Sequence, residues 1–306
     1  MDGQRSRAIT ANGEILQTSR TQISKKRSSA PALDYELLVL AAPAVLLVVV
    51  FFLVPLANVL VLSFTDPAVG FGNYHLLFTS SGMQRILART VRLSVITTIV
   101  SVAFGYLLAY VLAASPPRQR NAMLFFILVP FWASALVRAF SWILLLGREG
   151  PINALLQGAG LLSEPINVLY SETGVTIAMV HYMLPYAVFP LYSAMKNIDS
   201  QMLWASRGLG ASPASTFLHV YLPVTRPAIV AACSLVFVYS LGFYVIPIIV
   251  GGGRVIMIGQ YISINVLDTA QWGVASMLSV TLLVSILLLR AVERGSGRLL
   301  GQGRPS

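Results

Sequence analysis

The chain has 306 residues, of which 56% are hydrophobic and only 10% are charged, and its mean hydropathy is +0.77. A soluble globular domain is nearer one quarter charged, so this composition excludes an ordinary soluble protein and indicates an integral membrane protein. The net charge of +10 would suit a nucleic-acid-binding protein, but the basic residues follow a membrane pattern.

The first 36 residues are polar and rich in Ser, Thr, Arg and Lys, so we expect a disordered tail. The apolar run that follows is longer than the core of a signal peptide and lacks a clear cleavage site. We therefore expect an uncleaved first span, with an outer loop, over residues 37–85. Residues 293–306 are expected to form a C-terminal tail.

A spanning helix needs roughly 20 mainly apolar residues, and six stretches meet that need. The fourth contains two prolines, which spanning helices tolerate. The sequence therefore predicts an all-α polytopic membrane protein with six transmembrane helices, five of them in a core over residues 86–292. The six stretches are about 37–63, 91–114, 121–146, 174–195, 228–250 and 274–292.

The basic residues are distributed unevenly between the two sides of these spans. Of the 21 Lys and Arg residues, 15 lie on the side of the two termini and 5 on the other, and Arg138 lies inside a span. Cytoplasmic loops carry the excess of basic residues in membrane proteins. Both termini and the loop at 196–227 are therefore predicted to be cytoplasmic, and the charge gives no evidence for nucleic-acid binding.

The loop at 196–227, called the docking loop below, carries two sets of helix signals. Asp199 is a good N-cap, and Gly210 suits the left-handed position that ends a helix. Ser212 and Pro213 suit the start of a second helix, which we expect Pro223 and Pro227 to end. Two short helices around Gly210 would expose small residues and a tryptophan, a shape that suits insertion into a groove on a partner. A plain connection between two spans is the alternative.

The spacing of this loop resembles the cytoplasmic "EAA" loop of ABC importer permeases, which docks into a separate ATPase subunit. The residues that carry the resemblance, and that it implies dock on the ATPase, are Ala205, Ser206, Gly210, Leu222 and Pro223. Trp204 stands where that family usually has Glu. A tryptophan offers a large apolar anchor, the kind of residue that dominates interface energetics.

The resemblance extends from about Phe71 to Arg290. The segments Pro130–Asn153 and Gly242–Arg254 are similar to parts of spermidine/putrescine permeases. The resemblance implies the type I ABC importer permease fold in a bacterial inner membrane. It also implies a second permease, a dimer of ATPase subunits that use ATP, and an extracytoplasmic solute-binding protein, with no cofactor bound by this chain. The implied solute is a polyamine such as spermidine or putrescine, and another small organic solute or an ion is the alternative.

Four residues are candidates for the translocation pathway. Arg138 is a cation inside a span, where it costs roughly 2.5–3.5 kcal/mol on insertion scales and usually faces the bundle interior or water. Tyr239, Phe243 and Tyr244 offer aromatic faces, which attract cations, although core packing would also explain them. The spans contain no Asp or Glu at mid-membrane depth.

The chain carries no recognisable catalytic, metal-binding or ATP-binding motif. Its three histidines are scattered, its one cysteine (Cys233) lies in a span, and it has no P-loop. A membrane-embedded enzyme is therefore disfavoured. A self-sufficient secondary transporter stays a weaker alternative, because paired intramembrane acids and an internal repeat are absent from the sequence.

Overall fold

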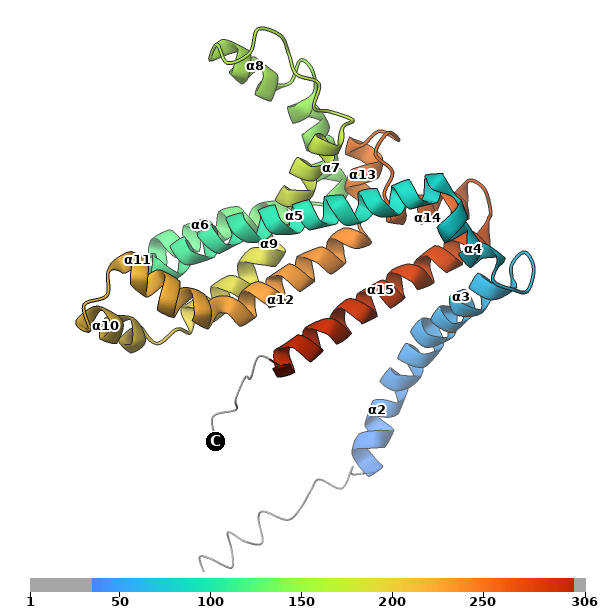
Figure 1. The fold of residues 1–306 in the computed structure, drawn as a ribbon, viewed down its shortest axis with the longest axis horizontal. Helices are drawn as coiled ribbons and strands as arrows, with labels where there is room; N and C mark the ends of the chain where they lie inside the picture. Colours follow the sequence, from blue (N-terminus) through green and yellow to red (C-terminus); the bar gives the residue numbers. More distant parts are fainter. Residues whose placement is uncertain (1–34, 300–306) are drawn as a thin grey trace, which may run out of the picture. The chain divides into compact units, whose positions relative to one another are not determined.

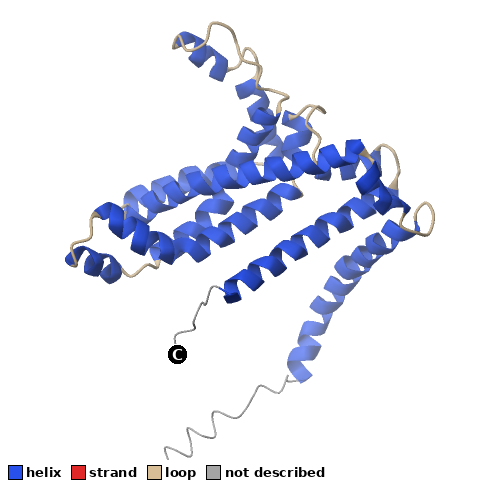
Figure 2. Ribbon diagram, viewed as in Figure 1, coloured by secondary structure: helices blue, strands red, loops and turns tan. Residues whose placement is uncertain are grey.

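The structure is a computed structural model that describes residues 35–299, and this part of the chain is helical and without strands (Figure 2). The helices are α2 (Tyr35–Val48), the π-helical turn η1 (Val49–Leu53), α3 (Val54–Thr65), α4 (Gly72–Thr79), α5 (Ser81–Ala114), α6 (Pro117–Trp132), α7 (Ala135–Leu146), α8 (Pro151–Gly158), α9 (Glu172–Lys196), α10 (Ser200–Gly208), α11 (Pro213–Thr216), the π-helical turn η2 (Phe217–Tyr221), α12 (Leu222–Leu241), α13 (Val245–Val250), α14 (Ile258–Leu267) and α15 (Trp272–Leu299). The tail expected at 1–36 lies outside the described residues except for residues 35 and 36, which begin α2. Of the tail expected at 293–306, residues 293–299 continue α15, and the rest lies outside the described residues.

Within the described residues, five helical segments are long and apolar enough to cross a membrane. They are Leu40–Thr65, Ser81–Ala114, Glu172–Lys196, Pro213–Leu241 and Trp272–Glu293. A sixth span is available if the bent pair Pro117–Trp132 and Ala135–Gly158 crosses as one unit. The all-helical, polytopic expectation is confirmed. The chain divides after Asn58 into two units, which are described separately.

The first unit contributes α2, η1 and the beginning of α3, which together make the start of the span Leu40–Thr65. The second unit is built on α5, α9 and α12, which pack along one another (Figure 1). Their shared core contains small side chains, among them Ala109, Ala187 and Ala232. Small residues let helix backbones approach closely inside a membrane.

Helices α5 and α9 approach each other closely at Gly105. A Cβ atom built on Gly105 would lie 2.7 Å from the Cβ of Ala187, which is closer than real side chains come. At the start of the same two helices, Arg89 and Arg92 both pair with the carboxylate of Glu172, and the Arg89 Nε to Glu172 Oε1 distance is 3.0 Å. A close packing contact and an ion pair therefore join α5 to α9.

The third apolar stretch, expected as one span at 121–146, is bent by 99° between α6 and α7. Two local features explain the bend. Pro130 removes a backbone donor near the end of α6, and the Ser134 hydroxyl accepts from the backbone N–H of Leu136 to start α7 as a new helix. The sequence predicted one spanning helix here, whereas the structure has two helices joined by a bend, which can still cross as one span.

The fifth stretch, expected at 228–250, also differs from the sequence prediction. Helix α12 ends at Leu241, and α13 begins separately at Val245. Pro247 has no N–H to bond to the carbonyl of Phe243, so a continuous helix would lack that hydrogen bond. The break places α13 against α7 (Figure 1), and this packing positions the side chains discussed below.

Candidate functional site: the docking loop and an aromatic cluster

The docking loop folds as its capping residues predict. The Asp199 Oδ1 accepts from the backbone N–H of Gln201 at 2.8 Å and caps α10. Gly210 has φ +85°, the left-handed conformation that favours glycine. The Ser212 hydroxyl accepts from the backbone N–H of Ser215 at 3.2 Å, and Pro213 occupies the first turn of α11. The prediction of two helices around Gly210 is confirmed.

The second helix, however, does not end at Pro223 or Pro227. Helix α11 continues through η2 into α12, so that Pro213–Leu241 forms one apolar helical segment of 29 residues. The wider π-helical turn η2 directly precedes Pro223, and the N–H of Leu222 bonds there to the carbonyl of Phe217. Such a turn gives room to the proline ring, which clashes with the carbonyl four residues earlier in a regular α-helix.

The residues expected to dock on a partner lie mostly on the outer face of this loop. The Trp204 side chain is 67% exposed, and Ala205, Gly210 and Pro223 are also exposed. Ser206 is half-buried, and its hydroxyl lies 3.0 Å from that of Thr216. Leu222 is half-buried as well. The face that these residues present is therefore accessible, except for Ser206, which joins α10 to α11.

The exposed face also carries two apolar side chains, Met202 of α10 and Leu209 directly after it. Leu209 is 90% exposed and Met202 is about half exposed. Leu203 points the other way and packs against the core formed by α5, α9 and α12. Helix α10 therefore has one face held by the protein and another apolar face open to a partner.

Arg138 is buried in α7, with only 8% of its surface exposed. Its guanidinium carbon lies 3.8 Å from the ring centroid of Tyr182 on α9, a close cation–π arrangement. The Arg138 Nε has no hydrogen-bond partner, and no carboxylate pairs with this residue, within residues 35–299. The ring of Tyr182 is therefore the main favourable contact seen for a buried cation.

Tyr182 belongs to a group of four rings, called the aromatic cluster below, that also contains Tyr186, Tyr239 and Phe243. The ring centroids lie 4.4 Å apart for Tyr182 and Phe243, and 4.9 Å apart for Tyr186 and Tyr239. Tyr182 and Tyr186 stack with an interplanar angle of 14°. The sequence predicts three aromatic candidates for the pathway: Tyr239, Phe243 and Tyr244. The two tyrosines of α9 connect the first two of these to Arg138.

The third, Tyr244, is not part of this cluster: it is about half exposed and makes no ring contact among the described residues. Sequence reasoning missed Tyr182 and Tyr186, although their four-residue spacing places both side chains on one face of a helix. That spacing was the available signal.

Comparison with known proteins identifies the family. Residues 101–298 match the family described as "Binding-protein-dependent transport system inner membrane component". The chain belongs to this family. It is a permease subunit of a binding-protein-dependent ABC importer in a bacterial inner membrane, and it is a transport component rather than an enzyme.

Among the relatives, the spermidine/putrescine transport system permease protein PotB of Haemophilus influenzae is 34% identical over 75% of this chain and 80% of its own length. PotB of Escherichia coli K12 is 32% identical over 71% and 79% of the two chains. The molybdenum transport system permease ModB of Azotobacter vinelandii is 28% identical over 65% and 89%.

Solved structures show the fold. A bacterial ABC transporter involved in the import of the acidic polysaccharide alginate aligns with TM-score 0.69 over 90% of this chain and 98% of its own, at 19% identity. The same type of transporter in complex with an alginate pentasaccharide-bound periplasmic protein aligns with TM-score 0.73 over 89% and 97%, at 18% identity. The expected ABC importer permease fold is confirmed.

Proposed function

We propose that this permease forms the membrane pathway for a polyamine and that the docking loop couples it to the ATPase. Three observations support the substrate: the similarity to PotB, the aromatic cluster, and the position of Arg138 on the face of Tyr182. The similarity to PotB carries the proposal. The contact between Arg138 and Tyr182 adds that this ring face accepts a cation.

In this mechanism the guanidinium of Arg138 holds the ring face of Tyr182 in the absence of substrate. A polyamine carries several ammonium groups, and aromatic faces attract such cations within about 6 Å of the ring centroid. Tyr186, Tyr239 and Phe243 offer further faces next to the first. The substrate would advance along these faces while Arg138 moves aside, because two cations on one ring face repel each other.

The docking loop would transmit movement of the ATPase dimer to the spans. Its core-facing side is fixed by Leu203 and by the Ser206–Thr216 contact, and helix α11 continues directly into α12. A displacement of α11 therefore passes along one continuous helix toward Tyr239, which lies near the end of α12. We place this loop and both termini in the cytoplasm, where the ATPase works, and we expect a second permease to complete the pathway.

A different small solute, including an anion, is the second candidate. The observation that favours an anion is the same buried Arg138, whose Nε has an unused hydrogen and no carboxylate partner within the described residues. The 28% identity to ModB is compatible with this candidate. The two candidates differ in the charge of the ligand, which a binding experiment resolves.

The test uses the cognate binding protein and the assembled transporter. Calorimetry is carried out on the binding protein with spermidine, putrescine and molybdate, followed by ATPase measurements on the reconstituted complex with the ligand that binds. We expect binding of a polyamine and a polyamine-dependent rise in ATP hydrolysis. Binding of molybdate alone would refute the polyamine assignment, and ion-gradient-driven uptake by this chain without an ATPase would refute the coupling proposal.

A further inference from the structure

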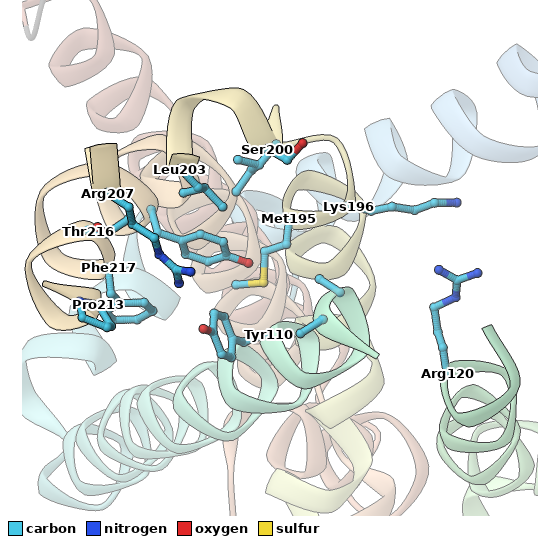
Figure 3. Close-up of a pocket in the computed structure, with 14 residues that line it drawn as sticks. Tyr110, Arg120, Met195, Lys196, Ser200, Leu203, Arg207, Pro213, Thr216 and Phe217 are labelled. Atoms are coloured by element: carbon cyan, nitrogen blue, oxygen red, sulfur yellow. The ribbon is translucent and has the colours of Figure 1, made fainter. Parts of the chain in front are cut away.

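A cavity of about 380 Å³ lies between the docking loop and the ends of the helices next to it (Figure 3). Its lining comes from the end of α5, from α6, from the end of α9 and from α10 to η2. Met195, Leu203 and Phe217 give it an apolar floor. Cavities of this size and lining are typical of sites for small molecules.

Three basic side chains on three different helices line this cavity: Arg120 of α6, Lys196 of α9 and Arg207 of α10. In the view of Figure 3, Arg120 and Lys196 extend on one side and Arg207 lies on the other, beside Phe217. The lining contains no Asp or Glu. The nearby Asp199 uses its carboxylate to cap α10.

These three cations have no carboxylate partner, since the ion pairs seen within residues 35–299 involve other arginines. Lys196 and Arg207 are exposed and Arg120 is half-buried, and all three line the cavity, whereas the exposed Arg118 lies outside this lining. Cations gathered around one cavity repel one another, and an anion among them removes that repulsion. Tyr110 and Tyr221 also line the cavity, and a tyrosine hydroxyl can donate a hydrogen bond to a bound anion.

We propose that this cavity binds the phosphate group of an anionic phospholipid of the cytoplasmic leaflet. Arginine matches phosphate with two parallel N–H···O bonds, and lysine binds it as a point charge. The apolar floor suits the beginning of an acyl chain, which free phosphate does not have. The assignment rests on the proposed cytoplasmic position of the loop, but it requires neither a polyamine substrate nor transport.

A lipid bound here would have a mechanical consequence. A lipid whose phosphate contacts Arg120 and Lys196 and whose other atoms extend toward Arg207 would link the helix that presents Trp204 to two other helices of the same unit (Figure 3). The occupied cavity would therefore stiffen α10 against α6 and α9. When α10 is held more rigidly, a movement of the ATPase displaces the membrane spans instead of deforming α10. The lipid would therefore raise the amount of solute transported for each ATP hydrolysed.

The test compares two arginines two residues apart. Arg120→Gln removes a cation from the cavity, whereas Arg118→Gln removes an equal charge from the same helix outside it. The assembled transporter is reconstituted in nanodiscs that contain phosphatidylcholine and phosphatidylglycerol. It is then released from the nanodiscs, and the lipid that stays bound is measured by native mass spectrometry. We expect the parent and Arg118→Gln to retain phosphatidylglycerol, and Arg120→Gln to retain it about tenfold less. Arg120→Lys keeps the charge and is expected to restore most of the retention.

Three results would overturn the assignment. Equal losses in Arg118→Gln and Arg120→Gln would show a diffuse effect of surface charge. Equal retention of phosphatidylcholine would show that the phosphate-bearing anion is not what is recognised. The melting temperature of the parent transporter is also measured with inorganic phosphate and with phosphatidylglycerol. A rise with inorganic phosphate but not with phosphatidylglycerol would assign the cavity to a free anion. If Arg120→Gln does not assemble, the comparison of Arg207→Gln with Arg118→Gln decides the matter in the same way.

Discussion

Replacing Tyr182 by leucine tests whether an aromatic face supports the buried cation and the passage of substrate. Tyr182→Leu removes the ring that lies 3.8 Å from the Arg138 guanidinium carbon and 4.4 Å from the ring centroid of Phe243. A cation–π contact contributes about 0.5–2 kcal/mol, and an aromatic pair contributes about 0.5–1.5 kcal/mol beyond its area. The change should therefore cost about 1–3 kcal/mol, which corresponds to about 5- to 150-fold if the whole loss falls on the transport step.

The assay is uptake of labelled spermidine into proteoliposomes that hold the whole transporter, with the binding protein outside and ATP inside. Tyr182→Phe keeps the ring face and is expected to transport within about twofold of the parent. Tyr192→Leu is the matched control, because it makes the same change on α9 outside the aromatic cluster. Equal transport by Tyr182→Leu and Tyr182→Phe, or an equal loss of uptake in Tyr192→Leu, would refute a role for the ring face of Tyr182.

Three further predictions concern the loop, the core and the ion pair. Trp204→Ala should reduce substrate-stimulated ATP hydrolysis more than Trp204→Glu, because glutamate restores the residue usual at this position; equal activity in both variants and the parent would show that Trp204 is no anchor. Gly105→Ala should destabilise the permease by about 1–3 kcal/mol, because its Cβ would meet Ala187 at 2.7 Å. Gly82→Ala in the same helix, where the nearest atom is 3.8 Å away, should leave the melting temperature unchanged or raise it, and a comparable fall in both would contradict the packing argument. Glu172→Gln should lower the melting temperature slightly, and less so at high salt, because partly exposed ion pairs contribute about 0–1 kcal/mol and are screened; a salt-independent loss would point to a different cause.

The parts of the fold that the sequence predicted are those that depend on local chemistry. The caps at Asp199 and Ser212 and the left-handed turn at Gly210 follow from the side chains themselves, so the two helices of the docking loop could be placed in advance. The six apolar stretches depend on composition and length, which are also readable without a structure.

The errors arose at prolines. A proline removes one donor wherever it stands, but the surrounding structure decides whether the helix ends, bends or continues. Near Pro130 the helix ended and a serine cap started a new one, whereas before Pro223 a π-helical turn let the helix continue. Ser134 is a local signal for a new helix after Pro130, whereas we find no local signal for the π-helical turn before Pro223.

The sequence predicted only part of the candidate pathway, because residues far away in the sequence complete it. Arg138 stands out because a charge inside a span is rare, and the aromatic residues at 239 and 243 lie close together in sequence. Their connection runs through Tyr182 and Tyr186 on a different helix, and only the packing of α7, α9 and α12 reveals it.

Site-specific crosslinking can show whether the exposed face of the docking loop contacts the ATPase. A photo-crosslinking amino acid is placed at Trp204 in the assembled transporter, and at Leu155 of α8, an exposed apolar position on a predicted outer loop, as a control. We predict that the probe at 204 captures the ATPase subunit and that the probe at 155 does not. Capture from 155, or no capture from 204 in a complex that hydrolyses ATP on addition of substrate, would contradict the account.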